Sequence, residues 1–179
     1  MAKKSKKKNL KKATRFVPFV LLVLGIVVAC MGFLAGVTYT PQYGDPSSVT
    51  IWKLAVGGSI EGLSLNLGGL ISQDTSIPFA ILPFLCLIVP LVGALVSLLL
   101  KGKVGGLIAT VCFLFAGVCF FFIPQVSFVK SVTEVLGKSS TTTTAFSAMN
   151  YTLGVGSIIG GVVSLVGGLV AGAYTAIVK

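Results

Sequence analysis

Side chains that could do chemistry are few in this sequence, and they are scattered along it. The chain has no histidine and only four acidic residues. The acidic residues are Asp45, Glu61, Asp74 and Glu134. No two of them have a motif spacing, and without histidine a general base would have to be a carboxylate, a lysine or a tyrosine. The sequence therefore indicates no enzyme, no cofactor and no metal site.

The four cysteines all fall inside apolar segments, at Cys30, Cys86, Cys112 and Cys119. They form no Cys-x-x-Cys pair, so their positions favour a role as small packing residues. One alternative stays open. Residues 27–30 loosely match the motif that ends in the lipidated cysteine of bacterial lipoproteins, although the apolar run continues beyond it. We expect an uncleaved helix there, with lipidation of Cys30 as the alternative.

Positive charge is concentrated in residues 1–15, which hold eight of the 14 basic residues. These are Lys3, Lys4, Lys6, Lys7, Lys8, Lys11, Lys12 and Arg15. No aromatic residue is interleaved with them, and an apolar run follows directly. Such a polybasic arm is typical of contact with anionic lipid headgroups. We therefore expect membrane lipids as partners of the arm, and no nucleic acid.

The composition predicts a membrane protein. Hydrophobic residues make up 55% of the 179 residues and charged residues only 10%, against about 25% charged in an ordinary soluble domain. Crossing a bilayer as a helix takes about 20 apolar residues. Four runs without Lys, Arg, Asp or Glu meet this length, at 16–38, 77–100, 104–123 and 152–178. They predict an all-α membrane fold, a four-transmembrane-helix bundle with a short turn at 101–103.

The charges outside these runs set the predicted orientation. The arm, the turn at 101–103 and Lys179 lie on one side and hold eleven basic residues and no acidic one. The opposite side holds all four acidic residues and only Lys53, Lys130 and Lys138. The positive-inside rule then places both termini in the cytoplasm of a multi-pass protein of the cell membrane.

The first exterior segment, 39–76, is long for a connection between helices. Residues 49–56 are rich in β-branched and aromatic types, and residues 63–67 alternate apolar with polar. Together they predict a small extracellular β-hairpin. Trp52, the only tryptophan, is expected to anchor at the membrane interface or under the hairpin, and a partner contact is the alternative.

The second exterior segment, 124–151, is predicted to combine a short helix with a linker. The apolar residues Val126, Val129, Val132 and Leu136 share one helical face, and Gly137 would end that helix. Residues 138–144, with four threonines, are predicted to be a flexible linker.

Small residues repeat at spacings of three and four along the predicted helices, as a glycine zipper does. In the last run they are Gly156, Gly160, Ser164, Gly168 and Gly172, and in the first Gly25, Gly32 and Gly36. Helices associate in lipid by close packing, so small residues mark contact faces. These faces either hold the four helices together or serve a homo-oligomer or a membrane-protein partner.

The layout resembles claudin-like four-helix proteins, with both ends inside, a long first exterior segment and a shorter second one. That family carries a Trp, then Gly-Leu-Trp and two cysteines in the first segment. Here Trp52 is followed by residues 53–58, and the segment has no cysteine. The lysine-rich start and glycine-rich helices also resemble uncharacterised four-helix membrane proteins of low-GC Gram-positive bacteria. We expect a non-enzymatic tetraspan-type scaffold or interaction subunit, with a small transport or channel subunit as the alternative.

Overall fold

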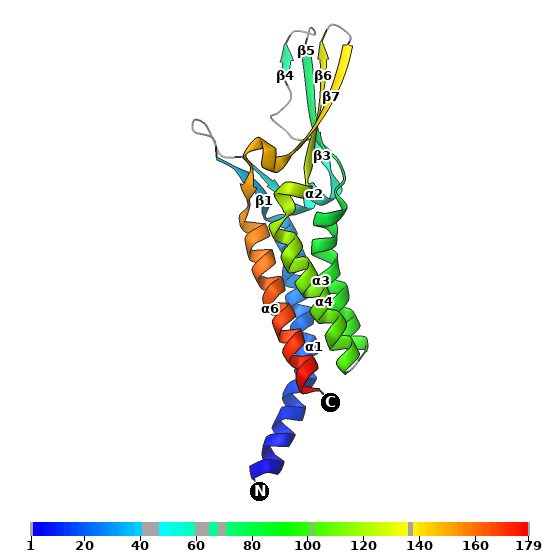
Figure 1. Ribbon diagram of the computed structural model, residues 1–179, viewed down its shortest axis with the longest axis vertical. Coiled ribbons are helices and arrows are strands. Elements are labelled where there is room, and N and C mark those ends of the chain that lie inside the picture. Colours follow the sequence, from blue (N-terminus) through cyan, green and yellow to red (C-terminus); the bar gives the residue numbers. More distant parts are fainter. Residues whose placement is uncertain are drawn as a thin grey trace. The chain divides into compact units, whose positions relative to one another are not determined.

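The computed structural model describes residues 2–40, 47–59, 65–67, 71–100, 102–135 and 138–178 (Figure 1). Side chains of residues 2–15, 65–67 and 71–73 lie outside that description. The chain divides into two compact units, each assembled from distant segments. Unit 1 comprises Met1–Met31, Leu85–Phe120 and Ile159–Lys179, and unit 2 comprises Gly32–Phe84 and Phe121–Ile158.

Four helices are long and apolar enough to cross a membrane, which agrees with the four predicted runs. They are α1 (Ala2–Cys30), α3 (Ile81–Leu99), α4 (Lys103–Phe121) and α6 (Val155–Ile177). Three predicted ends are wrong by several residues, because uncharged residues outside the helices extend the apolar runs. Helix α1 stops at Cys30, Ile77 belongs to a strand, and Thr152 precedes α6 in another strand.

Unit 1 has a shared core to which all four helices contribute. Leu21 of α1, Ala94 of α3, Ala109 and Phe113 of α4, and Ala171 of α6 are buried together. Along α3 the buried positions recur every three or four residues. They are Pro83, Cys86, Leu87, Pro90, Gly93, Ala94 and Ser97. This is the periodicity of a helix seam. Helix α3 is continuous through Pro90.

Unit 2 contains two antiparallel sheets, so the prediction of an all-α fold is wrong. The first sheet has the order β2-β1-β8, formed by Ser47–Thr50, Ala35–Tyr39 and Thr152–Leu153. The second runs β3-β5-β6-β7, and β4 also pairs with β5. Its strands are β3 (Gly58–Ser59), β4 (Leu65–Leu67), β5 (Ile71–Ile77), β6 (Phe128–Val135) and β7 (Lys138–Ala145).

The predicted hairpin of residues 49–56 and 63–67 is also wrong. Within residues 49–56, only Val49 and Thr50 belong to a strand, β2, and this strand pairs with β1. Residues Ile51–Val56 form the short helix α2, because the Thr50 side chain accepts a hydrogen bond from the Lys53 amide at 3.3 Å and so caps its first turn. Strand β4 pairs instead with β5, which lies later in the same segment.

The predicted helix and linker of the second exterior segment are both strands. Residues Phe128–Val135 form β6, which lies between β5 and β7 and pairs with both. Pairing along both edges outweighs the helical spacing of Val126, Val129 and Val132. The predicted helix stop, Gly137, lies outside the described residues. The threonine-rich tract forms β7, a use that suits its β-branched side chains.

The core of unit 2 joins its two chain segments. Val37, Ile51 and Leu54 come from the first segment, and Phe146 and Tyr151 from the second, where α5 (Ile123–Val126) and the 3-10 helix η2 (Phe146–Met149) also lie. All are buried. The Phe146 and Tyr151 rings meet edge to face at 5.0 Å, a favourable aromatic geometry.

The β1 carbonyl of Gly36 receives two hydrogen bonds from the second segment. The Gly154 amide donates at 2.9 Å and the buried Ser157 hydroxyl at 2.7 Å. These bonds satisfy a buried backbone oxygen, and they tie β1 to the residues that begin α6.

We predict that Gly57→Ala destabilises unit 2 by about 2 kcal/mol or more. Gly57 ends α2 with φ 85° and ψ −177°, a region that only glycine occupies without strain. A Cβ there would also lie 2.7 Å from the Ile77 carbonyl oxygen. Loss of the Trp52 fluorescence signal on heating in detergent measures this, because Trp52 lies in α2.

Gly58→Ala is the matched control. Gly58 shares the positive φ, at 141°, but a Cβ would meet nothing within 4 Å. It should lower the midpoint of the fluorescence transition less than Gly57→Ala does. Equal losses would show that contact with Ile77 contributes nothing.

Candidate functional site

The predicted helix-packing residues of α6 lie against α4 of the same chain. A Cβ added at Gly160 would lie 2.9 Å from the Phe120 ring, and one added at Gly168 would lie 2.7 Å from Leu114. A Cβ added at Gly172 would lie 3.6 Å from the Thr110 side chain, an ordinary van der Waals distance. The two helices are antiparallel, since partners in α6 fall in number as those in α4 rise. Large side chains of α4 therefore fill the gaps that the α6 glycines leave.

The contact is reciprocal, because α4 contributes glycines of its own. A Cβ added at Gly106 would lie 2.9 Å from the Tyr174 ring, and one added at Gly117 would lie 2.8 Å from the Leu165 side chain. The residues predicted from spacing were the small ones, and their large partners, above all Phe113 and Phe120, were not predicted. Their spacing of seven on α4 was an available signal, since it is the repeat of a helix seam.

The predicted packing residues of the first run do not share one helix. Gly25 lies on α1, where a Cβ would meet the backbone of Leu91 at 3.2 Å. Gly32 is buried in the 3-10 helix η1 (Met31–Phe33) and Gly36 lies in β1, so the predicted helical stripe is wrong beyond α1. Gly36 is nevertheless closely packed, because a Cβ there would lie 2.8 Å from Leu54.

The remaining residues of the predicted α6 stripe also find contacts within the chain. Gly156 packs beside Leu34 and Ala35 in unit 2, where a Cβ would lie 2.8 Å from the Leu34 side chain. Ser164 is fully buried in unit 1, and its hydroxyl has no partner among the described residues. The outward side of α6 carries large apolar side chains instead, such as Val162, Val166 and Leu169.

The cysteines behave as packing residues in the described part of the chain. All four are free. Cys112 lies on α4 opposite Gly93 of α3, and its Sγ would be 3.1 Å from a Cβ added there. Two turns further along the same antiparallel pair, the side chains of Cys86 and Cys119 meet. Cys30 is exposed at the end of α1, and its lipidation stays a prediction.

The polybasic arm falls outside the described side chains. Its backbone from Ala2 onward is helical and continuous with α1. The side chains of residues 3–15, including Lys3 and Arg15, are not described, so the predicted contact with anionic lipid stays a prediction.

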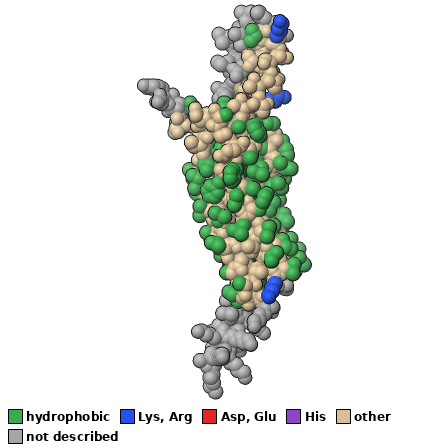
Figure 2. Space-filling model, in the orientation of Figure 1, with side chains coloured by type: hydrophobic (Ala, Val, Ile, Leu, Met, Phe, Trp, Pro, Cys, Tyr) green, Lys and Arg blue, Asp and Glu red, His purple; other side chains and the backbone are tan. Residues whose placement is uncertain are grey.

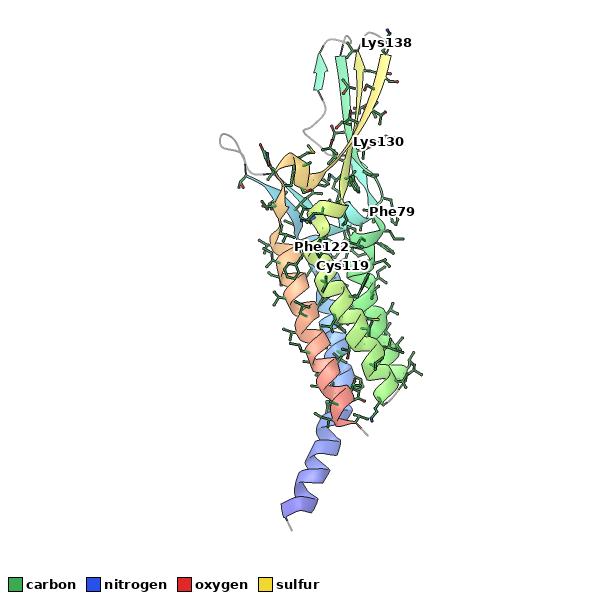
Figure 3. All side chains as sticks on the ribbon, in the orientation of Figure 1. Phe79, Cys119, Phe122, Lys130 and Lys138 are labelled. Carbon is green, nitrogen blue, oxygen red and sulfur yellow. The ribbon has the colours of Figure 1, made fainter. Side chains whose placement is uncertain are left out.

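Aromatic side chains adjoin the ends of the apolar helices in the sequence. Phe33 follows α1. Phe79 precedes α3 and Phe122 follows α4 (Figure 3). All three are exposed, by 74%, 61% and 53%. Trp52 of α2 lies with its ring centroid 6.3 Å from that of Phe33, and its Nε1 atom is buried without a partner among the described residues.

Among the described residues, no group of three or more His, Cys, Asp or Glu side chains that could hold a metal ion occurs. Asp45 and Glu61 lie outside those residues. Asp74 and Glu134 lie on the neighbouring strands β5 and β6, but they are not opposite each other, because Asp74 pairs with Val132.

The polar surface that the sequence analysis missed is the ribbon of β5, β6 and β7. Strand β6 pairs with β7 over eight residues without a shift of register. Lys130 and Lys138 project from β6 and β7 (Figure 3). Most side chains of these two strands are exposed or half-buried, and Val129 is the buried exception.

Comparison of the chain with protein-family models, with curated proteins and with solved structures finds no match. The two features that this structure offers for function are therefore the α4–α6 contact and the exposed ribbon, and both are interpreted from their own contacts.

We predict that Gly167→Ala weakens unit 1 by about 1–3 kcal/mol, the usual cost of overpacking a core. A Cβ at Gly167 would lie 2.5 Å from the Phe113 ring, and Phe113 is fully buried. Thermal unfolding of the purified protein in detergent, followed by loss of helical circular dichroism, measures the effect.

Gly172→Ala is its control on the same helix. The added Cβ would make only ordinary contacts with Thr110, the nearest at 3.6 Å, and alanine favours the helix by up to about 1 kcal/mol over glycine. This variant should be as stable as the wild type or slightly more so. If both variants lost the same stability, the α4–α6 contact would not depend on these gaps.

Proposed function

We propose that this chain is a non-enzymatic multi-pass membrane protein, a tetraspan-type scaffold or interaction subunit. Its four long helices cross the bilayer, and its two exterior segments present the sheets of unit 2 to water on the outer side. Both termini lie in the cytoplasm.

The observation that carries this proposal is the inverted side-chain distribution of α6. Its buried residues are Gly, Ser or Ala apart from Tyr174 near its end, and its outward side carries large apolar residues. The outward set is Val155, Ile158, Ile159, Val162, Val166, Leu169 and Ile177. A helix on the surface of a soluble protein would place polar side chains there. Figure 2 shows hydrophobic side chains over the helices in this view.

The interior of unit 1 supports a structural role over coupled transport. Transporters carry ionisable groups at membrane depth, and none of the four apolar runs contains Lys, Arg, Asp or Glu. Lys103, the first residue of α4, lies just before the third run. The hydroxyls of Thr110 and Thr175 bond back to their own helix, to the carbonyls of Gly106 and Ala171 at 2.8 Å. These groups are thus already satisfied.

The glycine contacts bear on where a partner would bind. Four α6 glycines, Gly160, Gly167, Gly168 and Gly172, face α4, and Gly156 faces Leu34 and Ala35, so these glycines support a role in holding the chain's own helices together. The surface left for another protein is then the exterior part of unit 2. A claudin-like layout stays a proposal of architecture.

The aromatic residues and charges fit the proposed orientation. Phe33, Phe79 and Phe122 adjoin the helix ends that lead to the exterior segments. Tryptophan is enriched at membrane interfaces, and Trp52, whose ring lies near that of Phe33, fits such a position. The polybasic arm and Lys103 mark the opposite, cytoplasmic ends.

We predict that, in sealed cells, a membrane-impermeant maleimide labels Ser139→Cys and does not label Lys103→Cys. Both positions are exposed, and the proposal puts them on opposite sides of the membrane. After permeabilisation both should react. The wild type, whose four cysteines lie in unit 1, gives the background. Labelling of residue 103 alone in sealed cells would show that the orientation is the reverse of the one proposed. A protein that stays in solution without detergent would contradict the proposal that it spans the membrane.

We also predict that the purified protein, reconstituted into liposomes with insertion verified, passes no more potassium or protons than protein-free liposomes do. A fluorescent dye inside the vesicles reports the flux. A flux that rises with the amount of protein would contradict the scaffold and favour the small transport or channel subunit instead.

A further inference from the structure

Strand β7 is an unprotected sheet edge. It lies at the end of the order β3-β5-β6-β7 and pairs only with β6 among the described strands. Six of its eight residues are exposed, and the last two are half-buried. Natural edge strands are usually guarded by shortness, by proline, by a bulge or by charges along the strand. Strand β7 has no proline and no register shift, and its only charge is at Lys138, its first residue.

The other sheet edges of this chain are protected. Strands β3 and β8 are two residues long and β4 is three. Strand β2 is four residues long, and its ladder with β1 shifts register between Ala35 and Val37. The eight-residue edge at β7 is therefore an exception within the described part of this fold.

The hydrogen-bond pattern tells which backbone groups of β7 are free. The Phe146 amide donates to the Ser127 carbonyl at 3.1 Å, and these residues continue the register in which Phe128 faces Ala145. In an antiparallel ladder, bonded and non-bonded pairs alternate. Thr142 and Thr144 therefore bond to β6, while Ser139, Thr141, Thr143 and Ala145 direct their N–H and C=O groups away from it.

The geometry points to a second copy of this chain as the occupant of that edge, joined by antiparallel β7–β7 pairing across a two-fold axis. Two such edges bond only when outward residues face outward residues. The register that places Thr142 opposite Thr142 of the second copy meets this condition and uses all four outward residues. Every residue paired is then Ser, Thr or Ala, types that fit opposite one another in a sheet.

Charge supports a second copy as the partner. In this register the two Lys138 residues lie at opposite ends of the paired strands, roughly 27 Å apart at about 3.4 Å per residue. That separation exceeds the Debye length of about 8 Å at physiological ionic strength, so the like charges do not oppose pairing. The edge carries no other charge that would select an acidic or basic peptide.

This inference rests on the proposed function, because it takes β7 to be in water on the outer side. The two can fail separately. Labelling of a β7 cysteine by impermeant maleimide reports the location of the strand, and cross-linking between copies reports the pairing.

The test is a disulfide scan of the full-length chain in native membranes. Each residue from 139 to 144 is replaced singly by cysteine and oxidised with copper–phenanthroline. Antiparallel pairing predicts a dimer yield that peaks at Thr142→Cys and falls at least fivefold by Ser139→Cys, because each step moves the two identical residues about 7 Å further apart along the strands. Ser48→Cys, an exposed serine on the edge strand β2, should give only the wild-type background.

Proline substitutions then separate pairing from folding. Thr143→Pro removes an outward N–H, which edge strands tolerate, and should reduce the cross-linking of Thr142→Cys at least tenfold while Trp52 fluorescence keeps its wild-type thermal midpoint. Thr143→Val, which keeps the N–H, should leave cross-linking unchanged. A yield at background throughout the scan, or one equal at all six positions, would overturn the proposal, and so would full cross-linking in the proline variant.

Discussion

Interlocking of glycine gaps with large side chains is the interaction on which unit 1 depends. In lipid, helices gain nothing from excluding water, so dispersion contacts at short range must hold them together. The α4–α6 pair meets this demand with Phe113 and Phe120 on one helix and Gly160 and Gly167 on the other. Because the aromatic rings of α4 already fill the gaps at these α6 glycines, neither set of residues is free to contact another protein through this face.

A second constraint, the hydrogen bonding of the backbone, explains why all the described strands lie in unit 2. Every backbone N–H and C=O at membrane depth needs a partner within the protein, and a helix supplies these partners from its own chain. A strand cannot, and it leaves one edge unpaired wherever a sheet stops. In unit 2, some backbone groups are satisfied by bonds outside the ladders, as when Gly154 and Ser157 both donate to the Gly36 carbonyl. The long edge at β7 is left for water or for another strand.

The sequence predicted the long helices well, because hydropathy is a sum over about 20 residues. It misplaced the end of the first helix because β1 is as uncharged as residues 16–30 of α1. Helix α2 was missed because Ile51 and Val56 suit strands, whereas the Thr50 cap and the burial of Ile51, Leu54 and Ala55 on one face favour a helical turn. The pairing of β5 with β6 joins residues far apart in the chain, and such pairing leaves no local trace in either segment.

The candidate contact in α4–α6 was half predictable. Spacing revealed the glycines of α6, but it could not reveal which neighbour occupies them, since another copy and another helix would leave the same pattern. The ribbon was not predictable from its own residues. A run of Ser and Thr is typical of linkers, and only the presence of β6 beside it makes a strand of it.

The interleaving of the two units constrains the order of assembly during synthesis. Strand β5 leaves the ribosome before α3, and its partner β6 leaves only after α4. Strand β1 likewise waits for β8, which emerges just before α6. The ladders can close only when the intervening helices have turned the chain back to the same side. Until α3 and α4 have been made, β1 therefore has only β2 as a partner, and β5 has only β3 and β4.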